Sequence, residues 1–160
     1  MAITVPADGA VISASAFGIP VANQLNTAPL GIIAYKAGTG DFSYGGSETS
    51  FVNGTCNFNV NLVASRRYRI GMDTPIVSSG ASSGWNIWAK MNGVTQWYWA
   101  GSVGSSTETF QLITPPLKIG LAGNIAVTFT VSATGTNITV NGYNWRNPQA
   151  YIEDCGSLVP

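Results

Sequence analysis

The feature that most constrains the fold of this chain is the dipeptide Asn92-Gly93, set between two runs of alternating residues in the stretch WNIWAKMNGVTQWYWA at 85–100. Both residues tolerate the positive φ angles that a two-residue type I′ turn requires, so the pair is a strong short-range signal for a β-hairpin. The turn also sets a register. With Met91 opposite Val94, counting outward predicts further cross-strand pairs, Trp88 with Trp97 among them.

This register distributes the side chains over two faces, since successive residues of a strand point to opposite sides. The first face should carry Trp85, Ile87, Ala89, Met91, Val94, Gln96 and Tyr98. The second should carry Asn86, Trp88, Lys90, Thr95, Trp97 and Trp99. Both faces are apolar, and a sheet with one wet face would have aromatic residues on one side only. We therefore expect the second face to be covered as well.

Three covers stay open: an oligomeric partner, the N-terminal segment of the chain, or a ligand. Aromatic residues are enriched at protein interfaces, which favours a neighbouring subunit. Aromatic rings beside Asn86, Lys90, Thr95 and Gln96 would also suit a carbohydrate, whose CH faces stack and whose hydroxyls need polar partners. The candidate residues of a subunit interface or glycan platform are Trp85, Trp88, Trp97, Tyr98 and Trp99.

From residue 30 onward, short runs rich in Val, Ile, Thr and aromatic residues alternate with Gly, Ser and Asn, a pattern typical of successive strands. The run at 125–132 is an example, because it places Ile125, Val127, Phe129 and Val131 on one face. The predicted strands are 30–36, 48–52, 56–64, 67–73, 84–91, 94–100, 108–113, 124–132, 137–141 and 149–154. The pattern predicts an all-β chain, with an antiparallel, jelly-roll-like sandwich at 30–160.

The first 29 residues differ in character. Phe17, Val21 and Leu25 have helical i, i+4, i+8 spacing, whereas Gly18 and Pro20 weaken a helix. We predict a short helical or extended arm that docks on another protein. Its candidate docking residues are Ile3, Val5, Val11, Ile12, Phe17, Val21 and Leu25.

Composition narrows the possible partners. Charged residues make up 9% of the chain, seven basic against seven acidic, so much of the surface is expected to contact protein. The only basic cluster is RRYR at 66–69, which argues against nucleic acid as a partner. With no membrane-length apolar run and no secretory leader, we expect no membrane partner and synthesis in a cytoplasm.

Catalysis is not expected. The chain has no histidine, which removes the commonest general base and metal ligand. Nothing identifies a pair of carboxylates for acid-base work; adjacent Glu153 and Asp154 are interpreted as end-of-strand charges that pair with Arg146. Cys56 and Cys155 could form a disulfide, but free thiols are favoured. We therefore predict a protein that is not an enzyme and has no cofactor or metal.

Both ends of the chain resemble a known family. The opening TVPADGAVISASAFGIPVANQLN at 4–26 and the closing AYIEDCG at 150–156 resemble small virion proteins of tailed phages that infect actinobacteria. Cys155 stands where that pattern leads us to expect an apolar residue. The resemblance implies a trimeric jelly roll whose N-terminal segment docks on the virion.

The leading hypothesis is a non-enzymatic virion structural protein, a capsid decoration or minor capsid protein made in the host cytoplasm. Its partners would be itself, as a homotrimer, and the major capsid protein or another virion protein. The alternative is a minor tail or receptor-binding protein that recognises a host cell-surface glycan through the aromatic hairpin. A third hypothesis is a free carbohydrate-binding module or glycosidase.

Overall fold

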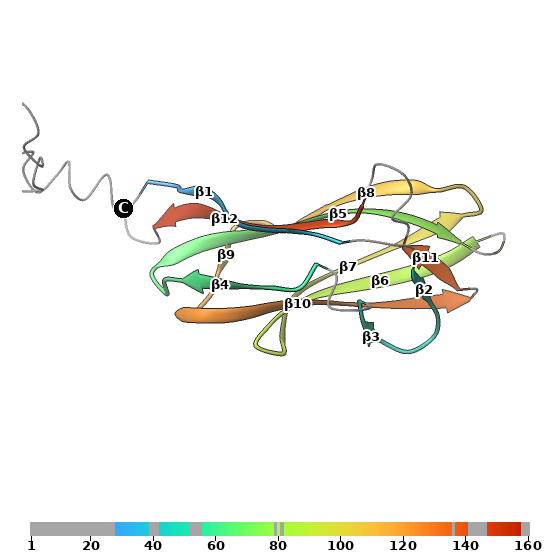
Figure 1. Ribbon diagram of the computed structural model, residues 1–160, viewed down its shortest axis with the longest axis horizontal. Coiled ribbons are helices and arrows are strands. Elements are labelled where there is room, and N and C mark those ends of the chain that lie inside the picture. Colours follow the sequence, from blue (N-terminus) through green and yellow to red (C-terminus); the bar gives the residue numbers. More distant parts are fainter. Residues whose placement is uncertain are drawn as a thin grey trace, which may run out of the picture.

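The computed structural model describes residues 28–38, 42–51, 56–78, 80, 82–135, 137–140 and 147–157. This part of the chain forms two antiparallel sheets stacked face to face (Figure 1). Its strands are β1 (Gly31–Ala37), β2 (Phe42–Tyr44), β3 (Thr49–Ser50), β4 (Phe58–Leu62), β5 (Arg66–Ser78), β6 (Ser82–Met91), β7 (Val94–Gly104), β8 (Glu108–Ile113), β9 (Leu117–Lys118), β10 (Gly123–Gly135), β11 (Ile138–Val140) and β12 (Gln149–Ser157). The predicted all-β sandwich is confirmed.

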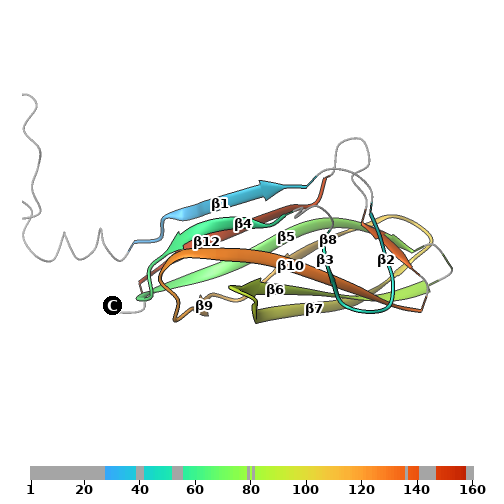
Figure 2. The same cartoon turned by 60° about the horizontal axis from the view of Figure 1, so that its bottom comes forward.

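The first sheet, here called sheet A, has seven strands built around the long strand β5. On one side β5 pairs with β12 and then with β11, and these lead outward to β1 and β2 respectively. On its other side β5 pairs with β8 and β9. The second sheet, sheet B, has five strands, in which β10 pairs with β6 on one side and with β3 and β4 on the other, and β7 forms the edge beyond β6. Figure 2 shows β1 and the β6–β7 hairpin on opposite sides of the molecule.

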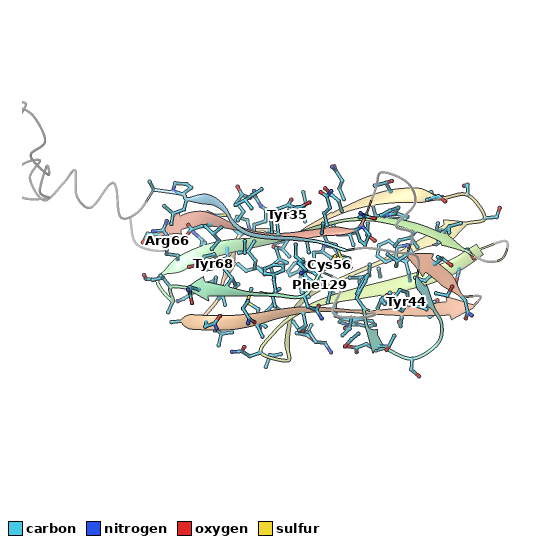
Figure 3. All side chains as sticks on the ribbon, in the orientation of Figure 1. Tyr35, Tyr44, Cys56, Arg66, Tyr68 and Phe129 are labelled. Carbon is cyan, nitrogen blue, oxygen red and sulfur yellow. The ribbon has the colours of Figure 1, made fainter. Side chains whose placement is uncertain are left out.

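The core lies between the two sheets and follows the predicted alternation. In β10, Ile125, Val127, Phe129 and Val131 are all buried, as the sequence predicts. Opposite them, β5 contributes Tyr68, Ile70, Met72 and Ile76, each no more than 1% exposed. Figure 3 shows Tyr68, Cys56 and Phe129 between the sheets.

The strand boundaries differ from the predicted ones mainly in β5. The predicted strand ends at 73, yet the observed strand runs through Pro75 to Ser78, although proline cannot donate a ladder hydrogen bond. The reason is topological. β5 leaves β12 after Asp73 and meets β11 from Ile76 onward, so Pro75 lies where that side of the ladder is interrupted.

Two short strands, β2 and β9, are not among the predicted ones, because strands of three and two residues are too short to show a period. The predicted arm at 1–29 lies almost wholly outside the described residues, and so do all seven of its candidate docking residues. None of the described residues belongs to a helix with the length and apolarity needed to cross a membrane.

Candidate functional site

The β6–β7 hairpin forms at Asn92-Gly93 as predicted, with both residues at positive φ (48° and 80°). Met91 pairs with Val94, as the two-residue turn requires. The next predicted pair, Lys90 with Thr95, also forms. Beyond it the register shifts through a β-bulge, and Gln96 has no partner of its own on β6.

The bulge corrects the predicted register. Beyond it, Trp88 is opposite Tyr98 rather than Trp97, and Ala89 is opposite Trp97. A slip of one residue turns every later side chain of β7 to the other face. Trp97 and Trp99 therefore share the core-facing side with Ala89, and the predicted Trp88 and Trp97 pair does not form.

The five candidate aromatic residues are consequently divided between two faces. Trp85 is 3% exposed and packs edge to face on Phe110, with ring centroids 4.8 Å apart. Its ring covers Gly101, where a Cβ atom would collide with the indole. Trp99 packs against the same core, and Trp97 lies at the rim of this side. Trp85 and Trp99 belong to the packing between the sheets, whereas Trp97 lies on the same side of the hairpin but is 36% exposed. Of the five candidates, Trp88 and Tyr98 point outward.

Trp88 and Tyr98 form an aromatic pair on the outer face of sheet B. Tyr98 is 61% exposed and Trp88 is half-buried. On the side of Trp88 away from Tyr98, Thr130 of β10 lies directly opposite Trp88. The three side chains thus form a row across β7, β6 and β10.

An ion pair lies beside this row. Lys90 donates a hydrogen bond to Oε1 of Glu48, and the Thr130 hydroxyl donates to the same oxygen at 2.6 Å. These two hydrogen bonds lower the pKa of Glu48 below its usual 4.5, so the carboxylate is charged at neutral pH. The sequence did not connect Glu48 with this surface, because 42 positions separate it from Lys90.

Small side chains make up the rest of this face. Asn86, two residues before Trp88, lies between Ala100 on β7 and Ser132 on β10, and its amide donates to the Ser132 hydroxyl at 3.5 Å. At Gly84, a Cβ atom would collide with the Thr134 hydroxyl. Further along sheet B a shallow hollow of about 220 Å³ lies between β4 and β10, lined by Asn57, Phe58, Asn59, Ala126, Val127 and Thr128.

The outer face of sheet A has a different character. Across β1, β12, β5 and β8, Tyr35, Tyr151, Gly71 and Ile113 are directly opposed in one row. Tyr35 is 55% exposed and Ile113 is 46% exposed, while the Tyr151 ring covers Gly71 so closely that a Cβ atom there would collide with it. In the neighbouring row Ile32 is 62% exposed. We call Ile32, Tyr35, Tyr151 and Ile113 the sheet A stripe, and Figure 3 shows Tyr35 on this outer side.

Two ion pairs connect the RRYR cluster with the closing strand. Arg66 binds Asp154 through two hydrogen bonds, at 2.5 and 2.8 Å, and the pair is buried at one end of the sandwich (Figure 3). Arg69 binds Glu153 at 2.8 Å on the outer face of sheet A. The described partners of these two carboxylates are thus Arg66 and Arg69; Arg146, the predicted partner, lies outside the described residues.

The same Arg66 side chain also fixes the start of the described chain. Its Nη2 donates to the carbonyl oxygen of Ala28 at 2.5 Å. Asp154 also accepts from the backbone N–H of Gly156, whose φ of 100° suits glycine. The closing segment that carries the family resemblance thus forms a structural clamp at the point where residues 1–27 join the sandwich.

Cys56 and Cys155 are both free thiols. Burial raises the pKa of Cys56 to about 12, and its thiol donates to the carbonyl oxygen of Pro148 at 3.4 Å. Burial also raises the pKa of Cys155. Neither thiol is therefore activated as a nucleophile at neutral pH. Among the residues that the structure describes, no three His, Cys, Asp or Glu side chains gather into a group that could hold a metal ion.

No protein-family model matches this chain, and no curated protein matches it. Solved structures resemble it at low scores. One, described as "CBM4 structure and function", is 10% identical with a TM-score of 0.40, covering 84% of this chain and 83% of that one. Structures from infectious bursal disease virus are similar too: the Gx strain particle is 16% identical with a TM-score of 0.38, covering 82% of this chain and 37% of that chain.

The VP2 subviral particle of the same virus is also 16% identical, with a TM-score of 0.32, and the match covers 78% of this chain and 37% of the viral one. This chain therefore spans little more than a third of the viral chains. The structural neighbours thus include proteins of virus particles. Likenesses of this score and identity carry no argument about function.

Proposed function

We propose that this chain is a non-enzymatic structural protein of a phage virion, a capsid decoration or minor capsid protein that docks through residues 1–29. In the assembled form, the sheet A stripe packs against a neighbouring copy of the chain in a homotrimer. The observation that carries the proposal is the exposure of aliphatic and aromatic side chains together on the outer face of sheet A.

The composition of the stripe favours a protein as the covering partner. Ile32 and Ile113 are exposed aliphatic residues, which gain stability by burial against other apolar groups and offer no hydrogen bonds to a polar ligand. Tyr35 and Tyr151 add large rings with one polar atom each, the kind of residue enriched at interfaces. Permanent homo-oligomers use surfaces of this kind because they never expose them to water.

The position of the arm supports the same proposal. Arg66 holds Ala28 at the end of the sandwich, and β1, which begins at Gly31, carries Ile32 and Tyr35 of the stripe. Leu30, between the clamp and β1, is 64% exposed. The point where the arm joins the sandwich, at Ala28, thus leads directly into the sheet A stripe. This continuity is expected if particle docking and subunit contact use the same side of the molecule.

The state of the carboxylates and thiols supports a role without catalysis. Three carboxylates, those of Glu48, Glu153 and Asp154, are held in ion pairs. The two thiols have raised pKa values. The ion pairs of Glu153 and Asp154 join β12 to β5, and the thiols stay protonated at neutral pH, which suits a structural protein.

Light scattering after size-exclusion chromatography tests the subunit contact. The wild-type chain should have the mass of a trimer, and Tyr35→Asp should reduce it toward that of a monomer because a charge would enter the contact. Tyr98→Asp is the matched control, since Tyr98 is a tyrosine of similar exposure on the opposite sheet. A monomeric wild type, or dissociation by Tyr98→Asp alone, would contradict the proposal.

Sedimentation with particles of the virus that encodes the chain tests docking. The full chain should co-sediment with particles that lack it, and a chain without residues 1–27 should remain in the supernatant while keeping its unfolding midpoint. If the truncated chain co-sediments equally well, the arm is not the docking element.

A further inference from the structure

The aromatic pair of sheet B differs from the sheet A stripe in ways that identify another kind of ligand. Trp88 and Tyr98 are opposed on adjacent strands, so their Cβ atoms are about 4.5–5.5 Å apart and the two side chains stand side by side. They stand on a long hairpin whose strand β6 is paired along most of its length with β10, which holds the backbone beneath Trp88 in place. Each ring has only two side-chain torsions, so little conformational entropy is lost when a ligand stacks on it.

The surroundings of the pair are small and polar rather than aliphatic. Ala100, Asn86 and Ser132 form the row on one side of it. Tyr98 is the large exposed side chain that the structure describes on this face. Val94, which is also exposed, follows the turn and is paired with Met91, so it lies on the core-facing side. The rings of Trp88 and Tyr98 thus project beyond these smaller neighbouring side chains. Their edges and part of their faces are therefore open to a flat ligand.

The charge of this surface favours a neutral ligand. Lys90 and Glu48 neutralise each other within one ion pair. Among the residues that the structure describes, both hydrogen bonds to Glu48 end on Oε1, which leaves Oε2 of this ionised carboxylate as an acceptor for hydroxyl groups. Carboxylate acceptors make hydrogen bonds roughly twice as strong as neutral ones.

The dimensions of the surface exceed a single sugar ring. The row from Tyr98 through Trp88 to Thr130 crosses three neighbouring strands and is about 10 Å long. Thr130 is itself buried, so the acceptor that a ligand meets at this end is the carboxylate of Glu48, which binds Thr130 and is 38% exposed. In the direction along the strands, Asn86 adds an amide group two residues from Trp88. A ligand that stacks on Trp88 and Tyr98 can therefore also reach the carboxylate of Glu48 at one end and the amide of Asn86 at one side.

Saccharides combine these requirements, since their CH faces stack on aromatic rings and their hydroxyls donate to carboxylate and amide oxygens. We propose that the outer face of β6, β7 and β10 binds a neutral saccharide chain, with Trp88 and Tyr98 as stacking rings and Glu48 and Asn86 as hydrogen-bonding partners. This inference stands independently of the virion role, because the two surfaces lie on different sheets.

Affinity electrophoresis of the full chain in native gels tests this site. The probes are hydroxyethyl cellulose, laminarin, galactomannan and arabinoxylan, with heparin as an anionic comparison. The wild type should be retarded by at least one of the neutral polysaccharides and not by heparin alone. Tyr98→Ala and Trp88→Ala should each raise the apparent dissociation constant at least tenfold, and Glu48→Gln should raise it severalfold.

Val94→Ala is the matched control, because it removes exposed apolar surface from the same hairpin outside the saccharide face and outside the sheet A stripe, and it should leave retardation unchanged. Urea unfolding of each variant shows whether it is folded; since Tyr98 is exposed, its variant should unfold at the wild-type midpoint. The proposal is overturned if no neutral polysaccharide retards the wild type, or if Val94→Ala and Tyr98→Ala weaken retardation equally. A fall in oligomer mass caused by Tyr98→Asp would also overturn it, since a second copy would then be the occupant.

Discussion

The two adjacent carboxylates of the closing strand offer a stringent test of how burial determines the value of an ion pair. Asp154 and Glu153 each bind an arginine of β5, but the side chains of Asp154 and Arg66 are 2% and 10% exposed, whereas those of Glu153 and Arg69 are 32% and 35% exposed. Asp154→Asn and Glu153→Gln each remove one negative charge with almost no change of volume. Any difference between the two variants therefore reports the environment of the charge.

The expected difference is large. Without its counter-charge, the guanidinium of Arg66 is left buried and uncompensated, a change that typically costs about 3–5 kcal/mol. Asp154→Asn also weakens the acceptor of the Gly156 N–H. The exposed pair of Glu153 contributes only about 0–1 kcal/mol, since water and salt screen it. Against a typical total stability of about 5–15 kcal/mol, only the first loss is a substantial fraction.

Urea unfolding followed by tryptophan fluorescence measures both values. Asp154→Asn should lower the midpoint strongly with an unchanged m value, and it should lower the melting temperature by about 10–20 °C. Glu153→Gln should remain close to wild type. The double change Arg66→Met with Asp154→Leu should recover much of the loss, because an apolar pair carries no unpaired charge. Equal losses in the two single variants would refute the reasoning.

Three further predictions concern the hairpin and the titrating groups. Trp85→Ala should destabilise the protein by about 3–5 kcal/mol and Tyr98→Ala by less than about 0.5 kcal/mol, measured by urea unfolding, because only the first residue lies in the core; similar losses would contradict the observed register. The stability that Glu48 contributes should be present at neutral pH and disappear as pH falls below 4.5 through its lowered pKa, so wild type and Glu48→Gln should converge in acid unfolding series. At pH 8, Cys56 should react with a thiol reagent far more slowly in the folded protein than in urea, since its pKa is raised to about 12; equally fast labelling would show that the thiol is accessible.

The hairpin shows how far sequence reasoning reaches. The turn at Asn92-Gly93 and the first two pairs beyond it were predictable, because turn geometry is set by two residues and their allowed φ angles. The bulge at Gln96 was not, since nothing in its residue type distinguishes an unpaired position from a paired one. One unpaired residue then exchanged the faces of Trp97, Tyr98 and Trp99, and this changed which aromatic residues are available to a ligand.

The candidate site depends on tertiary structure to a greater degree. The sequence identified the aromatic residues around the hairpin, but Glu48 joins them only because β3 and β10 pair in sheet B and bring its carboxylate to Lys90 and Thr130. The row formed by Tyr35, Tyr151, Gly71 and Ile113 likewise draws one residue from each of four strands that are far apart in the chain.

The sequence by itself determined the class of the fold, because period-two alternation and turn residues act locally, over a few positions. It also determined that the chain carries few charges and no histidine, which limits the chemistry available to it. Only the tertiary structure decided which arginine binds which carboxylate, which aromatic side chains are buried, and which residues share an outer face. Those outcomes depend on strand pairing and register between distant segments, and the free energy of such pairing comes from packing across the whole sandwich rather than from any local run of residues.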